Sequence, residues 1–230
     1  DRDRVEVIYG SFPPDRFDRT LDGTQVRREL LQGAASDSPL VGVIAKLSRY
    51  KSHDVFLQAA ARVLQRHSNA VFPIIGPDLE GYGAVLEEQA RQLGKDHDVA
   101  LREALRFTGP RQDIPAILAA LEVSVSASAT QWEGLSGVMR ESLAMACPVV
   151  CTDVGGNREL VRPGKTGILV QPGSVEELAE AILQHLDHPR EARIMADQGW
   201  QLVQAEFSNA ARARTMEALY RRLLAEAPSV

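Results

Sequence analysis

Residues 40–76 read LVGVIAKLSRYKSHDVFLQAAARVLQRHSNAVFPIIG and decide the fold. They begin with a continuous apolar run at 40–45, which is typical of a strand buried on both faces. Apolar residues then recur at helical spacing through 53–67, and a second apolar run at 70–75 is closed by Gly76. A strand, a helix and a second strand in this order predict a βαβ unit, whose two strands run parallel.

The same alternation continues beyond this unit. Further strands are predicted at 105–108, 122–126, 148–152 and 167–170. Further helices are predicted at 82–94, 114–121, 137–146, 175–187, 190–204 and 208–225. We therefore expect an α/β fold with a Rossmann-like parallel sheet and helices on both of its faces. Such a sheet binds its ligand at the carboxyl ends of its strands, so functional residues should lie in the loops that follow strands.

The pattern divides the chain into three parts. Residues 1–38 are polar and punctuated by Pro and Gly, and they predict an interdomain linker with a short strand at 5–9 and a short helix within 20–38. Residues 39–207 are expected to form the Rossmann-like domain, and residues 208–230 a C-terminal helix. Two placements of that helix stay open: it crosses back toward another domain, or it packs on its own domain.

Composition narrows the function classes. The 230 residues are 44% hydrophobic and 25% charged, which is ordinary for a soluble globular protein. A net charge of −5 argues against a general nucleic-acid binder, which needs a basic stripe. No apolar run approaches the roughly 20 residues that span a bilayer. The two cysteines, Cys147 and Cys151, lie in an apolar run and are expected to be reduced core residues of a cytosolic protein.

Two lysines follow the first core strand. Lys46 comes directly after the strand, and Lys51 lies near the start of the next helix. Two cations at the carboxyl end of a strand, beside a helix N-terminus, favour an anion site. The alternative is a pair of solvated lysines that flank a loop.

Two glutamates bracket a glycine-rich loop after the strand at 122–126. Glu133 opens the loop Gly134-Leu135-Ser136-Gly137-Val138, and Glu141 lies one to two turns into the helix that follows. Loop amides and a helix N-terminus can bind a phosphate, and two carboxylates beside it can accept hydrogen bonds from sugar hydroxyls. The alternative is a helix start with ordinary acidic residues.

Gly155 and Gly156 follow the strand at 148–152. Paired glycines permit a close backbone approach to a ligand. A tight turn without a ligand explains them equally well.

Taken together and in order, these segments resemble retaining GT-B glycosyltransferases of family four, also called group 1 glycosyl transferases. The matching segments are 43–51 (VIAKLSRYK, like VGRLxxxKG), 133–141 (EGLSGVMRE, like EGxGxxxxE), 148–156 (PVVCTDVGG, like PVVATDVGG) and 164–170 (GKTGILV, like GxTGxLV). Residues 7–17 also resemble the segment that begins the C-terminal half of these enzymes. The resemblance covers about the whole chain.

The resemblance implies a role for each matched position. Lys46 and Lys51 would neutralise the diphosphate of a UDP- or GDP-linked sugar donor, and with Glu133, which would face the sugar hydroxyls, they form the catalytic set. Glu141 would bind the ribose hydroxyls. The remaining donor-binding positions are the backbone of Gly134, Leu135, Ser136, Gly137 and Val138, together with Pro110 and Arg111 near the base.

The chain departs from the family pattern at several positions. Lys46 stands where the family has arginine, so the charge is kept but the bidentate fork is lost. Ser52 replaces a glycine, and Gly10 replaces an asparagine in the segment that begins this half. The stretch 95–104 is longer than usual and is expected to be a surface insertion.

The activity implied by the resemblance is transfer of a sugar, with retention of configuration, from the donor to a saccharide or lipid-linked acceptor, as in polysaccharide or lipopolysaccharide biosynthesis. No cofactor and no metal is expected. The two Asp-x-Asp pairs, at 1–3 and 96–98, do not follow a core strand and are expected to be solvated, as are most of the five histidines. The lysines and the helix N-terminus would stabilise the leaving phosphate instead.

Family members place their active site between two Rossmann-like domains, and this chain matches only the second. We therefore expect a donor-binding domain that lacks the acceptor half and full activity. The protein is expected to be cytoplasmic, and any attachment to the inner face of the membrane would be made through the absent half. Two alternatives stay open: a non-catalytic nucleotide-sugar-binding module, and a nucleotide-sugar epimerase. The sequence leaves the base, the sugar and the acceptor undetermined.

Overall fold

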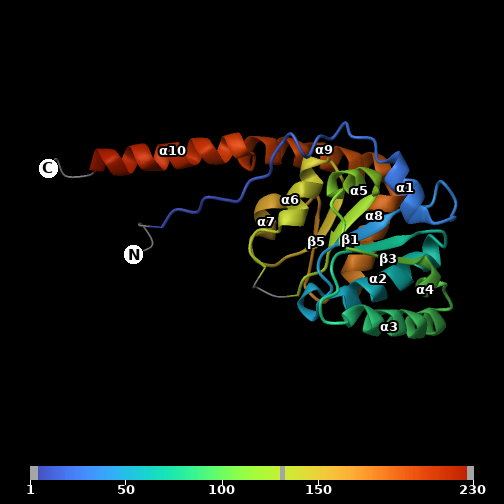
Figure 1. Cartoon of the computed structure of the whole chain (residues 1–230). Helices are drawn as coiled ribbons and strands as arrows, with labels where there is room; N and C mark the ends of the chain where they lie inside the picture. The colour runs from blue at the N-terminus through green and yellow to red at the C-terminus, as the bar shows by residue number, and fades with distance from the viewer. Residues whose placement is uncertain (1–4, 130–132, 227–230) are drawn as a thin grey trace.

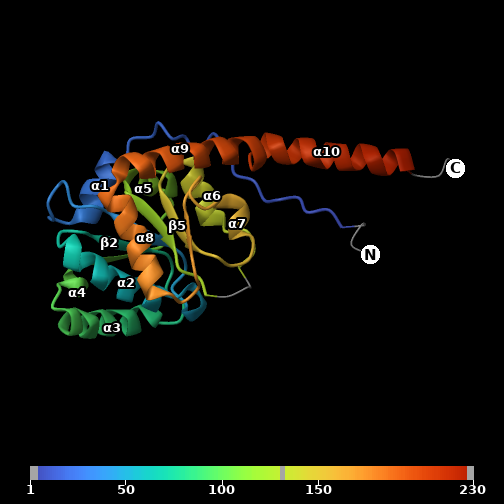
Figure 2. The same cartoon turned by 180° about the vertical axis from the view of Figure 1, so that it is seen from behind.

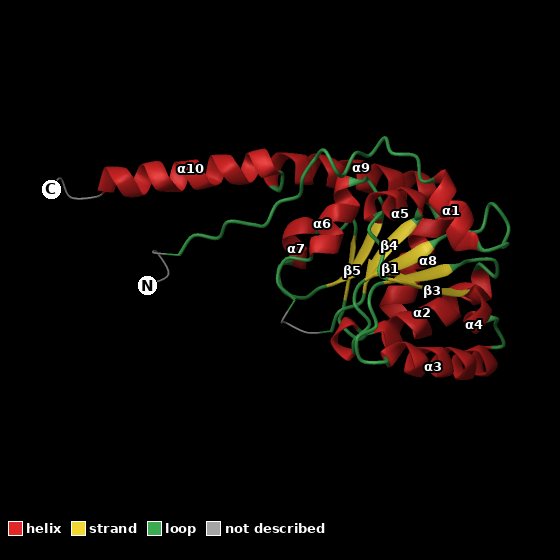
Figure 3. Ribbon diagram, in the orientation of Figure 1, coloured by secondary structure: helices red, strands yellow, loops and turns green. Residues whose placement is uncertain are grey.

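A computed structural model describes residues 5–129 and 133–226. Its strands form one parallel six-stranded sheet, in the order β3-β2-β1-β4-β5-β6, with helices on both faces (Figures 1 and 3). The strands are β1 (Val41–Ile44), β2 (Phe72–Ile75), β3 (Leu105–Gly109), β4 (Val123–Ser126), β5 (Val149–Thr152) and β6 (Ile168–Val170). The predicted α/β, Rossmann-like fold class is confirmed.

The helices divide into two layers. One layer consists of α2 (His53–Arg66), α3 (Tyr82–His97), α4 (Leu101–Ala104) and α8 (Val175–Asp187). The opposite layer consists of α1 (Thr24–Leu31), α5 (Ile114–Ala120), α6 (Gly137–Ala144), α7 (Asn157–Leu160) and α9 (Pro189–Glu206). A 3-10 turn, η2 (Arg49–Lys51), and the terminal helix α10 (Asn209–Glu226) complete the described elements. The short elements η2, α4 and α7 were not predicted, because runs of three or four residues show no helical period.

The sheet contributes side chains to a core on each face, because successive side chains of a strand point to opposite faces. Val43 lies in the core beneath α2 and α8, whereas Ile44 lies in the core beneath α5 and α6. Val150 and Cys151 divide in the same way. Cys147 and Cys151 are free, buried thiols, as expected from the sequence.

The sheet has a topological switch point between β1 and β4. These strands are neighbours, in the register Val41↔Val123 and Val43↔Val125. β2 and β3 lie beyond β1, whereas β5 and β6 lie beyond β4. The loops that follow β1 and β4 therefore leave the sheet in opposite directions and open a crevice between them, which is where open α/β sheets bind ligands.

The N-terminal segment departs from the prediction. The strand expected at 5–9 does not form, and these residues are extended but unpaired. Strand formation requires a partner for the backbone, and the segment runs beside the projecting α10 instead of along the sheet (Figures 1 and 2). Tyr9 packs its ring against Phe207, with centroids 5.3 Å apart, and Phe12 forms an isolated bridge with Ser208.

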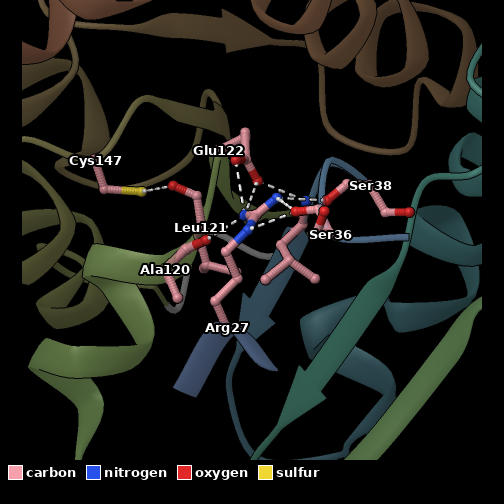
Figure 4. Close-up of polar contacts among 8 residues, drawn as sticks. Arg27, Ser36, Ser38, Ala120, Leu121, Glu122 and Cys147 are labelled. Carbon is pink, nitrogen blue, oxygen red and sulfur yellow. Dashed lines mark hydrogen bonds and ion pairs between the residues drawn. The ribbon is translucent and has the colours of Figure 1, made fainter. Parts of the chain in front are cut away.

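One arginine fastens α1 to the amino-terminal edge of the sheet (Figure 4). Arg27 Nη1 donates to both carboxylate oxygens of Glu122, at 2.8 and 3.1 Å, and to the Ala120 carbonyl at 3.1 Å. Its other nitrogens donate to the carbonyls of Ser36 and Ser38. Glu122 in turn accepts from the Leu40 amide, at 2.6 Å. The clamp fixes the stretch that leads into β1.

The predicted insertion at 95–104 ends α3 and forms α4. Asp96 and Asp98 are exposed there, as expected, whereas the pair at 1–3 lies outside the described residues. Within the described residues, no helix is long and apolar enough to cross a membrane.

Candidate functional site

A cavity of about 300 Å³ lies at the carboxyl ends of β1 and β4, at the switch point. It brings together most of the side chains and amides predicted from the sequence: Lys46, Lys51, Glu133, Ser136, Gly137, Val138 and Glu141. A larger cavity of about 450 Å³ lies beside His185, and none of the predicted residues lines it. Convergence of the predicted residues, and not cavity size, marks the candidate site.

Lys51 and Glu133 form an ion pair across the crevice. Lys51 Nζ donates to Glu133 Oε2 at 2.5 Å, and the two side chains are 20% and 14% exposed. Lys51 ends η2, and Ser52 follows it in the left-handed conformation, with φ of 50°. That conformation is easiest for glycine, which accounts for the glycine that the family pattern has at this position.

Tyr50 joins the two lysines, and sequence reasoning missed it. The Lys46 ammonium lies 4.8 Å from the centroid of the Tyr50 ring, and the Lys51 ammonium lies 5.5 Å from it. No sequence pattern indicates that a tyrosine next to Lys51 contacts both lysines, because that contact depends on how η2 turns the chain. Both cations that line the cavity therefore lie against one aromatic ring.

The paired glycines Gly155 and Gly156 pack closely against the loop that carries Glu133. Gly155 has a φ of 52°, and a Cβ there would lie 1.6 Å from the Glu133 carbonyl oxygen. The Gly156 amide donates to the Gly134 carbonyl at 3.0 Å, and Leu135 packs against Gly156. The turn thus supports the loop that carries Glu133. Gly134 and Leu135 face this turn and do not line the cavity.

The N-terminus of α6 forms another wall of the cavity. Ser136 is the N-cap, and its Oγ accepts from the Met139 amide at 3.4 Å. The first amides of a helix have no partner within the helix and carry partial positive charge. Gly137 and Val138 present this positive end to the cavity.

Glu141 also lines the cavity and is half-buried on α6. Burial raises the pKa of its carboxyl group, while Arg140 and Arg16 act in the opposite direction. The sequence did not single out either arginine. Arg16 comes from the N-terminal segment, so its proximity to Glu141 depends on tertiary structure.

Arg111 has a different environment. It follows β3, on the far side of β2 from the switch point, and does not line the cavity. Its guanidinium donates to Asp113, at 2.8 and 2.5 Å, and to Glu29 at 3.1 Å. The structure therefore does not bring Arg111 to the other predicted residues.

Two histidines correct the expectation of solvated rings. His53, at the start of α2, is 0% exposed, and burial lowers the pKa of its ring to about 4. His185 is buried in α8, and its Nε2 lies 3.2 Å from the Val149 carbonyl oxygen. Both lie on the inward face of an amphipathic helix, where position outweighs polarity. In the described part of the chain, no cluster of three or more His, Cys, Asp or Glu side chains could hold a metal.

Comparisons with known proteins identify the same region. A family model described as Glycosyl transferases group 1 matches residues 38–188. An alpha-D-kanosaminyltransferase of Streptomyces kanamyceticus is 29% identical over 209 residues, which cover 87% of this chain and 50% of that protein. A D-inositol 3-phosphate glycosyltransferase of Corynebacterium urealyticum is 31% identical over 227 residues, which cover 96% of this chain and 51% of that protein.

The chain is also similar in structure to a solved protein. Anabaena Alr3699/HepE in complex with UDP-glucose has a TM-score of 0.80 and 26% identity, over 93% of this chain and 57% of that chain. The chain spans about half the length of the curated relatives described above. The family match extends over β1, β4, α6 and every residue that lines the switch-point cavity, and the chain therefore belongs to the group 1 glycosyl transferases.

Proposed function

We propose that this chain is the donor-binding domain of a glycosyltransferase that moves a sugar from a nucleoside-diphosphate sugar to a saccharide or lipid-linked acceptor. One observation carries the proposal: Lys46, Lys51, Glu133, Glu141 and the α6 N-terminus line a single cavity at the switch point. Cations and helix amides match a diphosphate, whereas carboxylates match the hydroxyls of a ribose and a sugar.

The expected chemistry follows from charge. Cleavage of the bond between the sugar and the diphosphate builds negative charge on the leaving phosphate, and groups fixed beside it lower the barrier. Lys46 and Lys51 would stabilise this charge without a metal. Glu133 would hold the sugar, and Glu141 the ribose. As the family resemblance implies, we propose that the transfer retains the anomeric configuration.

We also propose that a second Rossmann-like domain supplies the acceptor site and any attachment to a membrane. Support comes from the half-length match to the curated relatives. Further support comes from apolar side chains exposed on the projecting α10, namely Tyr220, Leu223 and Leu224, and on the adjacent N-terminal segment, namely Val5 and Val7.

Calorimetric titration of this chain with UDP, GDP and ADP, and with their glucose and mannose conjugates, tests the donor site. We expect one base to be preferred, with equal affinity in EDTA and in magnesium. Lys51→Met and Glu141→Gln should each weaken binding at least about tenfold. The exposed residues Lys165 and Glu159 provide matched controls, and Lys165→Met and Glu159→Gln should bind within about twofold of the unaltered chain.

Failure of every nucleotide to bind would refute the donor-site proposal, and equal losses in the control variants would refute the assignment of residues. Strict dependence on magnesium would refute the metal-independent mechanism. With the full-length protein, NMR of the product should show the anomeric configuration of the donor. Conversion of the donor sugar without an acceptor would instead indicate an epimerase.

A further inference from the structure

We propose that Tyr50 is a positioning residue, whose ring holds Lys46 and Lys51 together as one receptor for a diphosphate. The inference rests on the proposed donor site and adds a residue to it. Its basis is the joint contact of both ammonium groups with the Tyr50 ring, at 4.8 and 5.5 Å from the centroid. Both distances lie within the range of about 6 Å in which a ring attracts a cation.

Two lysines do not approach each other unaided. Like charges repel, and a lysine side chain loses rotamer entropy when it is fixed in one place. Lys46 lies two residues after the end of β1, whereas Lys51 is the last residue of η2, so different elements support their backbones. The negative face of one aromatic ring attracts both ammonium groups, and this attraction offsets their repulsion.

The backbone that carries the ring is anchored. Tyr50 is the middle residue of η2, and its carbonyl accepts from the Ala129 amide at 3.3 Å. That bond links the loop after β1 to the loop after β4 across the switch point. Tyr50 is 39% exposed and does not line the cavity, so it acts through the lysines and not by touching the donor.

Glu133 completes the arrangement on one side only. It pairs with Lys51, whereas Lys46 contacts the Tyr50 ring and has no ion-pair partner among the described residues. Removal of the ring should therefore release Lys46 more than Lys51. Because prior ordering reduces the cost of binding, the loss should appear as weaker affinity for phosphates.

The test compares Tyr50→Leu, which removes the ring, with Tyr50→Phe, which keeps it, in calorimetric titrations with UDP, GDP and inorganic pyrophosphate. Tyr220→Leu, at an exposed tyrosine of α10, is the control for a lost surface ring. We expect Tyr50→Leu to weaken binding about three- to tenfold. Tyr50→Phe and Tyr220→Leu should bind within about twofold of the unaltered chain, and thermal unfolding should show that all three variants are folded.

A double-mutant cycle with Lys46→Met separates positioning from a general structural effect. If the ring acts through Lys46, the effect of Tyr50→Leu should largely disappear in the Lys46→Met background. Equal affinity of Tyr50→Leu and the unaltered chain would overturn this inference and leave the donor site intact. An equal loss in Tyr50→Phe, or full additivity in the cycle, would also overturn it. Failure of the unaltered chain to bind any of the three probes would refute this inference and the donor site together.

Discussion

Gly155 lies so close to Glu133 that a Cβ at position 155 would be 1.6 Å from the Glu133 carbonyl oxygen. The obstacle is backbone, so it cannot move aside as a flexible side chain would. Gly155→Ala should therefore displace the loop that carries Glu133, and it also forces alanine to adopt a φ of 52°. We expect a loss of about 1–3 kcal/mol in the free energy of unfolding and weaker binding of the donor.

Gly164→Ala separates the two causes. Gly164 has a φ of 68°, and a Cβ there would meet nothing within 4 Å. This variant should show only the backbone strain, about 1 kcal/mol, and normal binding. Urea denaturation and calorimetry of both variants provide the measurement. Equal binding by both variants would contradict the idea that Gly155 supports the Glu133 loop.

Local patterns carried most of the sheet and helix assignment. The apolar run at 40–45 identified β1, and the helix predicted at 175–187 is α8, whose start is marked by Ser174 as an N-cap that accepts from the Glu177 amide. Because parallel strands have their carboxyl ends at the same edge of a sheet, the ends of β1 and β4 could be predicted to lie together. Lys46, Lys51, Glu133 and Glu141 could therefore be brought to one edge without coordinates.

Long-range contacts could not be predicted in this way. Val5 and Val7 alternate as a strand would, but no strand in the described part of the chain pairs with them. The contact of Gly155 with Glu133 joins two loops that are separate in sequence, and the Tyr50 ring reaches both lysines only because η2 turns the chain. Arg111 has the positive charge that a phosphate site requires, but its ion pairs with Asp113 and Glu29 lie away from the switch-point cavity.

Lys51 and Glu133 lead to opposite predictions for nucleotide binding. Because Glu133 already occupies the Lys51 ammonium at 2.5 Å, a diphosphate must compete with it. Glu133→Gln removes the competing charge, so UDP or GDP should bind equally well or up to about fivefold more tightly. The same change should lower the rate of sugar transfer in the full-length enzyme, because the contact with the sugar is weakened.

Lys51→Met should instead weaken binding of the same nucleoside diphosphate at least about tenfold. The comparison uses calorimetry at low and high salt, because screening should reduce the effect of the Lys51 charge. A large loss of nucleoside-diphosphate affinity in Glu133→Gln would show that this carboxylate, contrary to our proposal, contributes to binding of the diphosphate.

The clamp of Arg27 on Glu122 predicts a stability effect far from the cavity. Arg27→Met removes bonds to one carboxylate and three carbonyls, and leaves Glu122 without its cation. Because the pair is partly exposed, we expect a loss of about 1–3 kcal/mol in the free energy of unfolding. Arg28→Met, on the exposed face of the same helix, should change it by less than about 0.5 kcal/mol. Urea denaturation distinguishes the two, and similar values would show that the clamp does not stabilise α1 on the sheet.

His53 makes stability depend on pH. Burial is the main cause that lowers the pKa of its ring to about 4; Lys51 lowers the pKa further, whereas the Ser48 backbone and Asp54 raise it. In the unfolded chain the pKa returns to about 6.5. Between these values the unfolded chain binds more protons than the folded chain, so stability falls as the pH falls. The contribution of the neutral ring is complete above about pH 6.5 and is lost by about pH 4.

His53→Gln removes this titration and keeps a polar side chain of similar size. Between pH 7 and pH 4.5, the unaltered chain should therefore lose about 2 kcal/mol more of its free energy of unfolding than the variant does. Urea denaturation at half-unit intervals of pH gives both curves, and His185, which is buried in both proteins, contributes equally to each. Parallel curves would mean that the His53 ring is protonated inside the fold at pH 4.5, and hence that water or a counter-charge reaches the ring at the N-terminus of α2.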